Sequence, residues 1–384
     1  MPSLIDSIKN NGNISGTALS IQDTLFQVTG GQLGKIGDNF LLVGGNNFTG
    51  RYNPHNGPSF VQKYSNSIRR FQIREENGQL YLDSVNVTYN STDLHRRDYN
   101  LSPYINAAGN YGYTLFSGVF QYMFDLPYHN LIEIGPSSYT VLPSFEQLLN
   151  QYHTARLAMY KQSTDEMWTV FFGGIVHYVP DGSGNFLVDD DVPFVKSIST
   201  VGRVGNQWSE YHIGDMPDFL GAAAEFVPSS NFNEYEADIL DLGAITDTTH
   251  VGYIVGGIES SADKIFWINT GIESWTNPYI YKVYLVPSAP SGVEEVPDIS
   301  GKVELKAYPN PSQGIFQIEY KGISTKGILY LHDVQERVVW KEEVNLHPLC
   351  TQETQVDLSH LSKGTYLLSF RTGSASRTNK LVIE

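Results

Sequence analysis

Four short apolar runs in this chain end in a doublet of small residues, and this repeat constrains the fold more than any other feature. The runs read LLVGG, TLFSG, VFFGG and YIVGG, and they close at Gly45, Gly118, Gly174 and Gly257. The closing glycines are 73, 56 and 83 residues apart, and strand-like segments precede and follow each doublet, such as Leu25–Val28 before the first. Four strands for each doublet predict β-propeller blades, in which glycine permits a positive φ and close backbone approach. The alternative is a β-sandwich whose hairpin turns contain the doublets.

The composition agrees with an all-β chain. The 24 Tyr, 19 Phe and 35 Gly favour strands and tight turns. One short segment, Ser144–Gln151, fits either a helix or an irregular loop. No apolar run is long enough to span a membrane as a helix. The single cysteine, Cys350, excludes an intrachain disulfide and a zinc site built on several thiolates.

The charge of −16 is unevenly distributed. Residues 301–384 carry 10 basic and 9 acidic side chains, so residues 1–300 hold 15 basic and 32 acidic ones. Such an acidic body repels phosphate backbones, which argues against nucleic-acid binding.

The doublets make residues 1–286 resemble a kelch-type β-propeller. Three segments add a resemblance to exported kelch-like proteins of Bacteroidota: LHRRDYNLSPYI (Leu94–Ile105), VPFVKSIST (Val192–Thr200) and VGYIVGGIESS (Val251–Ser261). The resemblance implies about four visible four-stranded blades, in either a small closed ring or an incomplete one. Members of that group usually carry a signal peptide and further blades upstream. Because MPSLIDSIKNNGNISG has no signal-peptide pattern, we expect an N-terminally truncated propeller.

The C-terminal segment has the sharpest motifs. After a Pro- and Ser-rich stretch at residues 287–302, predicted to be a linker, residues 303–384 alternate as strands of a small Ig-like β-sandwich. Their motifs resemble the type A sorting domain of type IX secretion cargo. The matching positions are Tyr308, Pro309, Asn310, Pro311, Gly314, Phe316, Asp333, Arg337, Asp357, Leu358, Gly364, Tyr366, Lys380, Leu381 and Val382. One departure is Glu336, where the family usually has glycine.

This resemblance implies partners and a location. The C-terminal domain would be recognised by the outer-membrane translocon and cleaved by a sortase. The expected location is therefore extracellular or on the outer-membrane surface.

Polar residues near the expected inner strand of each blade form the candidate ligand site. They are His95, Arg96, Arg97, Asp98, His153, Arg156 and Glu225. Inner strand ends converge on one mouth of a propeller channel, where such side chains can bind a carboxylate or a sugar. The alternative is that they form salt bridges and hydrogen bonds between blades.

The sequence offers one weak candidate for a metal site. Asp181, Ser183 and Asn185 alternate like the first ligands of a calcium loop, but Phe186 and Val192 stand where such a loop needs Gly and Glu. A solvated hairpin loop fits them better, and no metal or other cofactor is predicted. No catalytic fingerprint is present. The glycines of GQLGKIG (Gly31–Gly37) are spaced wrongly for a phosphate-binding turn, and this segment is predicted to be a hairpin between two strands.

Three function classes remain from the sequence, the third of them a purely structural surface-layer role. The first is an exported, non-enzymatic protein that binds a carbohydrate or a protein. The second is a mutarotase- or epimerase-type enzyme that uses acid and base side chains at the channel mouth, a comparison that rests on fold analogy.

Overall fold

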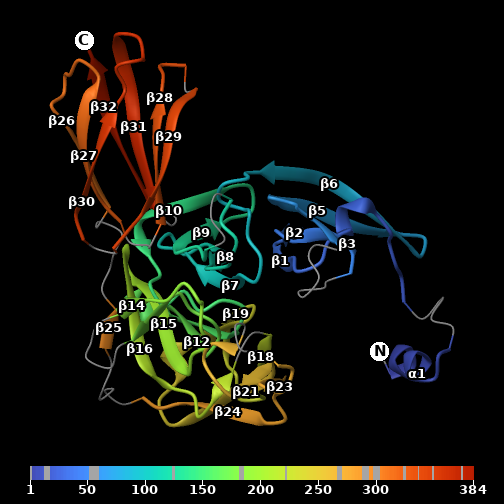
Figure 1. Ribbon diagram of the computed structural model, residues 1–384. Helices are drawn as coiled ribbons and strands as arrows, with labels where there is room; N and C mark the ends of the chain where they lie inside the picture. Colours follow the sequence, from blue (N-terminus) through green and yellow to red (C-terminus); the bar gives the residue numbers. More distant parts are fainter. Residues whose placement is uncertain are drawn as a thin grey trace. The chain divides into compact units, whose positions relative to one another are not determined.

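The computed structural model describes residues 2–12, 18–51, 60–122, 126–180, 186–220, 223–265, 270–287, 294–296, 303–322, 326–335, 337–347, 350–372 and 375–384 (Figure 1). The chain is all-β apart from one helix, α1 (Pro2–Lys9), and short 3₁₀ turns in these ranges. None of its described helices has the length and hydropathy to cross a membrane. The chain divides into two compact units, Met1–Arg97 and Asp98–Glu384.

The first unit is built on one antiparallel sheet. Its strands, in spatial order, are β1 (Gln32–Ile36), β2 (Asn39–Val43), β5 (Ser67–Glu76) and β6 (Gln79–Tyr89). A separate hairpin of β3 (Asn46–Gly50) and β4 (Phe60–Tyr64) leaves the sheet between β2 and β5. Phe71 is the centre of its core, stacked on Phe40 and touched edge-on by Phe26 from the 3₁₀ turn η1 (Thr24–Phe26).

The second unit opens with a four-stranded meander. It consists of β7 (Asn100–Ile105), β8 (Tyr111–Phe116), β9 (Asn130–Ile134) and β10 (Tyr139–Glu146), each paired with the next. Most residues of β8 and β9 are buried, as expected for central strands that are covered on both faces.

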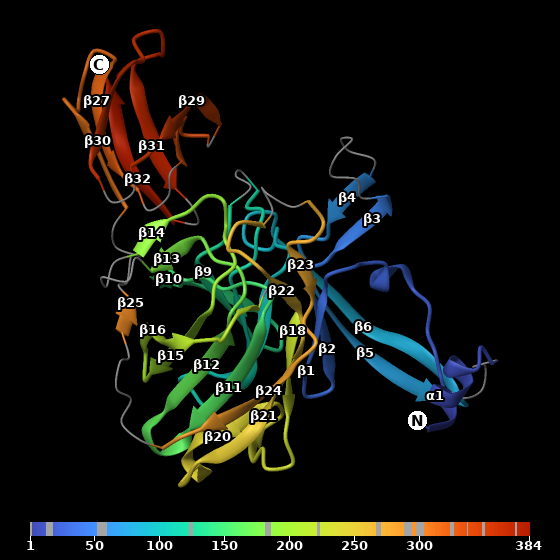
Figure 2. The ribbon, with the colours of Figure 1, turned by 60° about the horizontal axis from the view of Figure 1, so that its bottom comes forward.

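A larger sheet follows in the chain (Figure 2). Its central strands are β11 (Ala155–Lys161), β12 (Glu166–Phe172), β15 (Ser197–Val204) and β16 (Gln207–Asp215). A parallel strand, β20 (Ile239–Asp241), and its neighbour β19 (Glu234–Glu236) extend it beyond β11, and β25 (Glu294–Val296) extends it beyond β16. The hairpin of β13 (Tyr178–Pro180) and β14 (Phe186–Val188) and the turn η2 (Gln162–Thr164) interrupt these strands.

A three-stranded sheet completes the body. It contains β18 (Ala224–Pro228), β21 (Thr249–Gly256) and β24 (Ile280–Leu285). Around it lie β17 (Phe219–Leu220), β22 (Ile258–Ser260) and β23 (Ser274–Thr276), which form a small sheet, and the turn η3 (Leu242–Ala244). Three sheets therefore have the predicted run of four consecutive strands, and the last has three among the described residues.

All four doublets adopt the same backbone conformation. Each doublet follows or ends the second strand of its sheet. Both residues of each doublet have a positive φ. The values are 56° and 83° at Gly44–Gly45, 49° and 93° at Ser117–Gly118, 67° and 98° at Gly173–Gly174, and 73° and 87° at Gly256–Gly257. The carbonyl of the second residue accepts a backbone N–H each time, from Ser65, Tyr128, Val195 and Asn277 at 2.7–3.0 Å. These donors precede the third strand, so each doublet fixes the return of the chain to its sheet.

The first strands of the sheets in the second unit lie next to one another. Strand β11 contacts β7 on one side and β18 on the other. None of the described sheets closes on itself.

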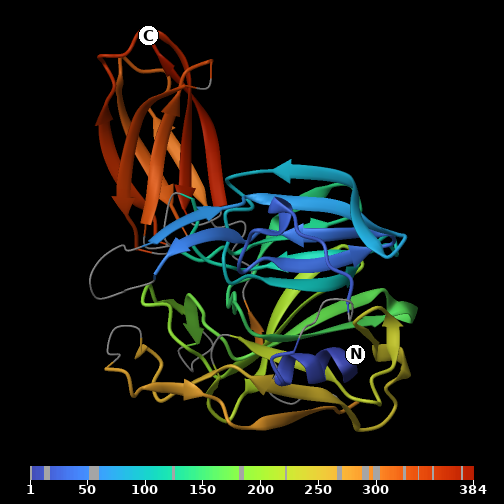
Figure 3. The ribbon, with the colours of Figure 1, turned by 90° about the vertical axis from the view of Figure 1, so that its right-hand side faces the viewer.

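The C-terminal residues form a two-layered sandwich (Figure 3). One layer contains β26 (Glu304–Tyr308), β27 (Ile315–Lys321) and β30 (Gln352–Asp357), and the other β28 (Lys326–His332), β29 (Val338–Asn345), β31 (Gly364–Thr372) and β32 (Ala375–Ile383). Phe316 and Ile318 from the first layer pack with Leu329, Leu331 and Phe370 from the second, all fully buried. The alternation of apolar residues in β27 and β31 explains this core.

Two local predictions were wrong. Leu25–Val28 was expected to be a strand, but it contains the turn η1, where the side chain of Asp23 accepts the N–H of Leu25. The GQLGKIG segment was expected to be a hairpin, but it contains strand β1.

The structure also describes two segments later in the chain, Ser144–Gln151 and part of the predicted linker at residues 287–302. Ser144–Gln151 has no helix, because its first residues belong to β10 after an irregularity in the β9 pairing. The predicted linker contains β25, which pairs with β16 and buries Val296.

Candidate functional site

The clearest polar group in the body lies where the first strands of three neighbouring sheets begin. Asp98, His153 and Ala223 stand just before β7, β11 and β18, and all three have a positive φ, of 56°, 51° and 67°. The Nδ1 of His153 lies 3.5 Å from the Oδ1 of Asp98. The carbonyl of His153 accepts the N–H of Ala223 at 2.8 Å. The three strand starts therefore form one row, which we call the strand-start row.

Two charged residues extend this row along the strands. Arg156 in β11 donates from Nε to the carbonyl of Leu101 in β7 at 2.8 Å. Burial lowers the pKa of Arg156, and the negative charge of Glu225 in β18 opposes that shift. The side chain of Asp98 is 31% exposed and that of His153 is 42% exposed, so solvent reaches the row.

The structure thus pairs Asp98 with His153 and places Arg156 within reach of the charge of Glu225, and these are four of the seven predicted residues. The other three belong to the first unit.

In the first unit, the predicted residues have structural contacts. His95 stacks on Tyr64 with ring centroids 4.0 Å apart, and its Nδ1 lies 2.9 Å from the Oδ1 of Asn66. Burial lowers the pKa of His95. Arg96 is buried and donates to the carbonyl of Asp93 at 2.7 Å, while Arg97 donates to Gln62 at 3.4 Å. These contacts agree with the alternative interpretation of His95 and Arg96, in which their hydrogen bonds stabilise the fold and do not bind a ligand.

The suggested calcium ligands Asp181, Ser183 and Asn185 lie outside the described residues. The aspartates that follow them have Lys264 or His177 as partners. Lys264 lies 2.7 Å from Asp189 and 3.3 Å from Asp191, and His177 lies 2.8 Å from Asp190. Within the described ranges, no three His, Cys, Asp or Glu side chains are grouped as metal ligands.

Sequence reasoning missed a buried histidine chain. The Nδ1 of His129 lies 2.9 Å from the carbonyl oxygen of Gln147, and its Nε2 lies 3.2 Å from Nδ1 of His177. The Nε2 of His177 in turn contacts Asp190 at 2.8 Å. Both histidines are almost fully buried, at 2% and 1% exposed. Neither belongs to a motif, and only the tertiary structure brings residues so far apart in the sequence together.

The hydrogen bonds and the burial of His129 determine its protonation state. The two outer ring nitrogens face oxygen acceptors, and one proton must lie between the two inner nitrogens. Burial lowers the pKa of His129 to about 3, helped by the neighbouring His177 and opposed by the bond to Gln147. His129 is therefore neutral.

A second missed group is the carboxyl of Glu210 in β16. It is 2% exposed, and its Oε2 accepts the backbone N–H groups of Leu148 at 2.7 Å and Leu149 at 3.3 Å. Its buried Oε1 has no hydrogen-bond partner in the described part of the chain. Burial raises the pKa of Glu210 from 4.5 to about 8, although the two N–H bonds oppose the shift.

We expect Glu210 to make the stability of the body depend on pH. As pH rises from about 4.5 to about 8, the unfolded chain ionises this carboxyl while the folded chain keeps it protonated, so the free energy of unfolding falls. Glu210→Gln should remove that fall, because the amide oxygen still accepts both N–H groups. Urea unfolding from about pH 5 to about pH 8 measures the difference. Asp215→Asn, exposed on the same strand, is the control, and parallel curves for wild type and Glu210→Gln would contradict the assignment.

The sorting-motif residues of the C-terminal sandwich hold its loops. Asn310 donates to the carbonyl of Lys380 at 2.7 Å and accepts the N–H of Val382 at 2.9 Å, so it clips the β26–β27 loop to β32. Gly314 has φ of 108°, and a Cβ there would lie 2.5 Å from Ser359. Any other residue at this position would require the loops to separate.

Two further motif carboxylates stabilise turns. Asp333 accepts the N–H groups of Gln335 and Arg337 and pairs with the Arg337 guanidinium at 2.6 Å. Asp357 accepts the N–H and hydroxyl of Ser359, which lowers the pKa of that carboxyl. The position of Glu336 in this loop lies outside the described residues.

The comparison with protein families identifies this sandwich. Residues 306–384 match the secretion system C-terminal sorting domain. This chain carries a type IX sorting domain. The domain indicates export through the type IX secretion system to the cell surface or beyond.

Two other comparisons concern the whole chain. No curated protein matches it. Among solved structures, it is similar to PorZ, described as an essential surface component of the type IX secretion system of Porphyromonas gingivalis, at 8% identity and a TM-score of 0.22. The alignment covers 92% of this chain but only 59% of PorZ.

Proposed function

We propose that this chain is an exported surface protein whose propeller-like body binds a carbohydrate or another small polar ligand at the strand-start row. The proposed export of the protein rests on the sorting domain. The observation that supports the binding half is the convergence of Asp98, His153, Arg156 and Glu225 from three neighbouring sheets. The translocon and a sortase are the proposed partners of the C-terminal domain.

Two observations favour a propeller for the body. Inner strands β7, β11 and β18 lie side by side, and all four doublets share one conformation. In a propeller, inner strands surround a central axis and their ends meet at one mouth. The strand-start row is then the edge of that mouth.

The chemistry of the row suits a hydroxylated ligand with a negative group. Carboxylates such as Asp98 and Glu225 accept hydrogen bonds from sugar hydroxyls, and a guanidinium such as Arg156 forms charge-assisted bonds with a carboxylate. Acidic sugars combine both features. A mutarotase-type enzyme would use the same residues as acid and base, and no contact in the structure favours it over binding.

A glycan array with the full chain tests the proposal. We expect one class of acidic glycan to bind, and His153→Ala combined with Glu225→Gln to weaken binding at least about tenfold, which corresponds to ~1.4 kcal/mol. His212→Ala is the matched control, because His212 also pairs with an aspartate, Asp215, away from the row. Equal binding by all variants would place the ligand elsewhere, and turnover of a sugar anomer lost with the double variant would favour the enzyme.

A further inference from the structure

The first unit contains a cleft between the edge of β3 and the segment that precedes β1. Residues 26–29 line one side of it and residues 46–49 line the other, and its volume is about 650 Å³. Sites for small molecules commonly have this size. A second hollow of about 500 Å³, lined by residues 21–24, adjoins the first at Phe26 and Gln27. The strand-start row belongs to the second unit, so this cleft is a separate site.

The first glycine doublet brings the two sides of the cleft together. A Cβ on Gly45 would lie 3.1 Å from the carbonyl oxygen of Thr29, so glycine allows the two segments to come close. Thr29 and Asn46 then exchange two backbone hydrogen bonds, of 2.8 and 2.9 Å. This bridge is isolated, so the two segments do not continue as a ladder, and the cleft opens beside it.

The edge of β3 presents backbone groups to the cleft. The carbonyl of Gly45 accepts the N–H of Ser65 on the side of β4, whereas Asn46 bonds to Thr29 on the opposite side. Because backbone groups alternate along a strand, the N–H and carbonyl of Phe48 point to the same side as those of Asn46. Neither group of Phe48 has a backbone partner among the described residues. The cleft therefore offers one donor and one acceptor to a ligand.

Aromatic and amide side chains line the cleft. The ring of Phe48 is 39% exposed and stacks on Phe60 with centroids 5.1 Å apart, which holds it in place. The side chain of Asn47 donates to the carbonyl of Gln27 across the cleft at 3.4 Å. The buried Oδ1 of Asn46 has no hydrogen-bond partner within the described ranges. None of the lining residues in this part of the chain is charged.

This lining favours a neutral sugar. Each amide side chain offers both a donor and an acceptor, and neighbouring sugar hydroxyls can bond to both. The face of an exposed aromatic ring is apolar and slightly negative, so it packs well against the C–H groups of a sugar ring. A charged ligand would lose its water in the cleft without gaining an opposite charge.

We propose that the first unit binds a neutral carbohydrate in this cleft, with a sugar ring on Phe48 and its hydroxyls bonded to Gln27 and Asn47. The proposal goes beyond the binding of an acidic glycan at the strand-start row, because it concerns another site and a ligand without charge. The protein then has two independent specificities.

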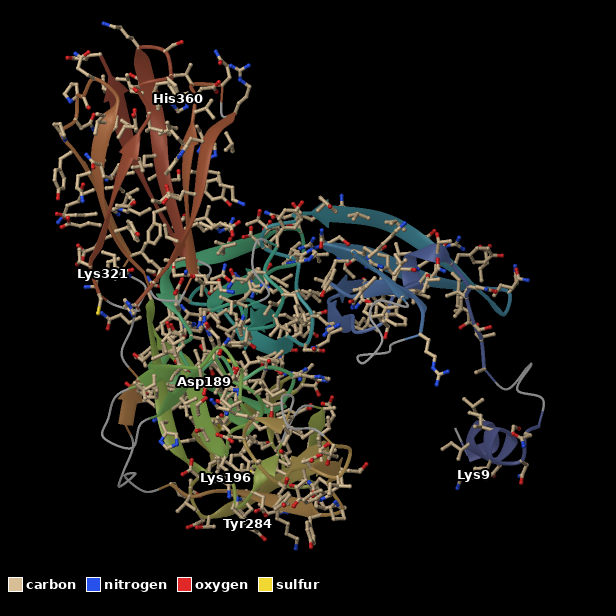
Figure 4. All side chains as sticks on the ribbon, in the orientation of Figure 1. Lys9, Asp189, Lys196, Tyr284, Lys321 and His360 are labelled. Atoms are coloured by element: carbon tan, nitrogen blue, oxygen red, sulfur yellow. The ribbon has the colours of Figure 1, made fainter. Side chains whose placement is uncertain are left out.

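Calorimetric titration of the full chain with neutral oligosaccharides tests the proposal. The probes are unbranched hexasaccharides of glucose, mannose, galactose and N-acetylglucosamine. Phe48→Ala removes the exposed ring, and Gln27→Ala removes an exposed amide. Tyr284→Ala is the matched control. Tyr284, labelled in Figure 4, lies on β24 in the second unit, is 50% exposed and packs on His250 with ring centroids 5.1 Å apart.

We expect at least one neutral hexasaccharide to bind, and Phe48→Ala to weaken its binding at least about tenfold, which corresponds to ~1.4 kcal/mol. Gln27→Ala should weaken it about threefold, the effect of one hydrogen bond between neutral groups. Tyr284→Ala should bind like wild type, and so should the row variant, His153→Ala with Glu225→Gln. The melting temperature of each variant shows whether it folds, and Gln27→Ala alone decides if Phe48→Ala melts well below wild type.

The outcomes separate this site from the strand-start row. If no neutral hexasaccharide binds, or if folded Phe48→Ala binds like wild type, the cleft inference is wrong, whether or not acidic glycans bind at the row. Loss of neutral binding in the row variant would also overturn it, because the sugar would then occupy the row. If Phe48→Ala instead removes binding of an extended peptide or an acidic glycan, the cleft has a ligand of another class and the inference fails.

Discussion

Replacement of Arg203 by methionine should lower the free energy of unfolding of the body by about 3 kcal/mol. The guanidinium is 1% exposed and connects two sheets. It donates to the carbonyl of Ile105 at the end of β7, to Gly205 and Asp165 in neighbouring hairpins, and pairs with the Asp165 carboxylate at 2.9 Å. Methionine keeps the apolar stem but leaves the buried Ile105 carbonyl and a carboxylate without their donor. Because Asp165 is 37% exposed, water compensates part of the loss, which places the estimate at the lower end for broken buried pairs.

Lys264→Met is the matched control for this experiment. Lys264 also contacts two carboxylates, those of Asp189 and Asp191, but all three side chains are reached by solvent. Exposed pairs contribute little because both partners stay hydrated when the pair is lost. Urea unfolding should therefore show a large decrease in midpoint for Arg203→Met and almost none for Lys264→Met. Equal decreases would mean that Arg203 does not connect the sheets.

The parts of the fold that could be predicted from sequence are those with a local cause. The doublets could be recognised in the sequence because a positive φ at both positions favours small residues, and all four doublets have that conformation. The turn at Asp333 has a local cause, because its carboxylate accepts N–H groups a few residues away. Asn310 and Gly314 act on residues far away in the sequence, and they were recognised only through the family motif. Leu25–Val28 failed for a local reason as well, since an Asp23 cap competes with an apolar strand pattern.

The candidate site was predictable only in part. Asp98, His153 and Arg156 occur at similar positions before successive doublets, so the repeat itself suggested that they meet. His129, His177 and Glu210 have no such spacing. Their roles depend on which backbone groups the fold places against them, and an isolated buried histidine or glutamate carries no signal in one sequence.

Removal of residues 301–384 should have the largest effect on the biology of this protein, because it deletes the matched sorting domain. The body should still fold, since its sheets have their own apolar cores in strands such as β11, β12 and β21. Export should fall by at least about a hundredfold, because a recognition step that loses ~2.7 kcal/mol or more retains about one per cent of its occupancy. The shortened protein should accumulate in the periplasm in a folded, protease-resistant form. Misfolded or degraded material would show instead that residues 301–384 are needed for folding of the body.

The most direct test of the account is the location of the complete protein in two strains of its own bacterium, one with and one without a working type IX translocon. Protease added to intact cells, together with immunoblots of medium, outer membrane and periplasm, measures this location. In the first strain, we expect the protein on the surface or in the medium, shortened by loss of its C-terminal domain. In the second strain, we expect uncleaved protein in the periplasm. Equal surface exposure in both strains would contradict it.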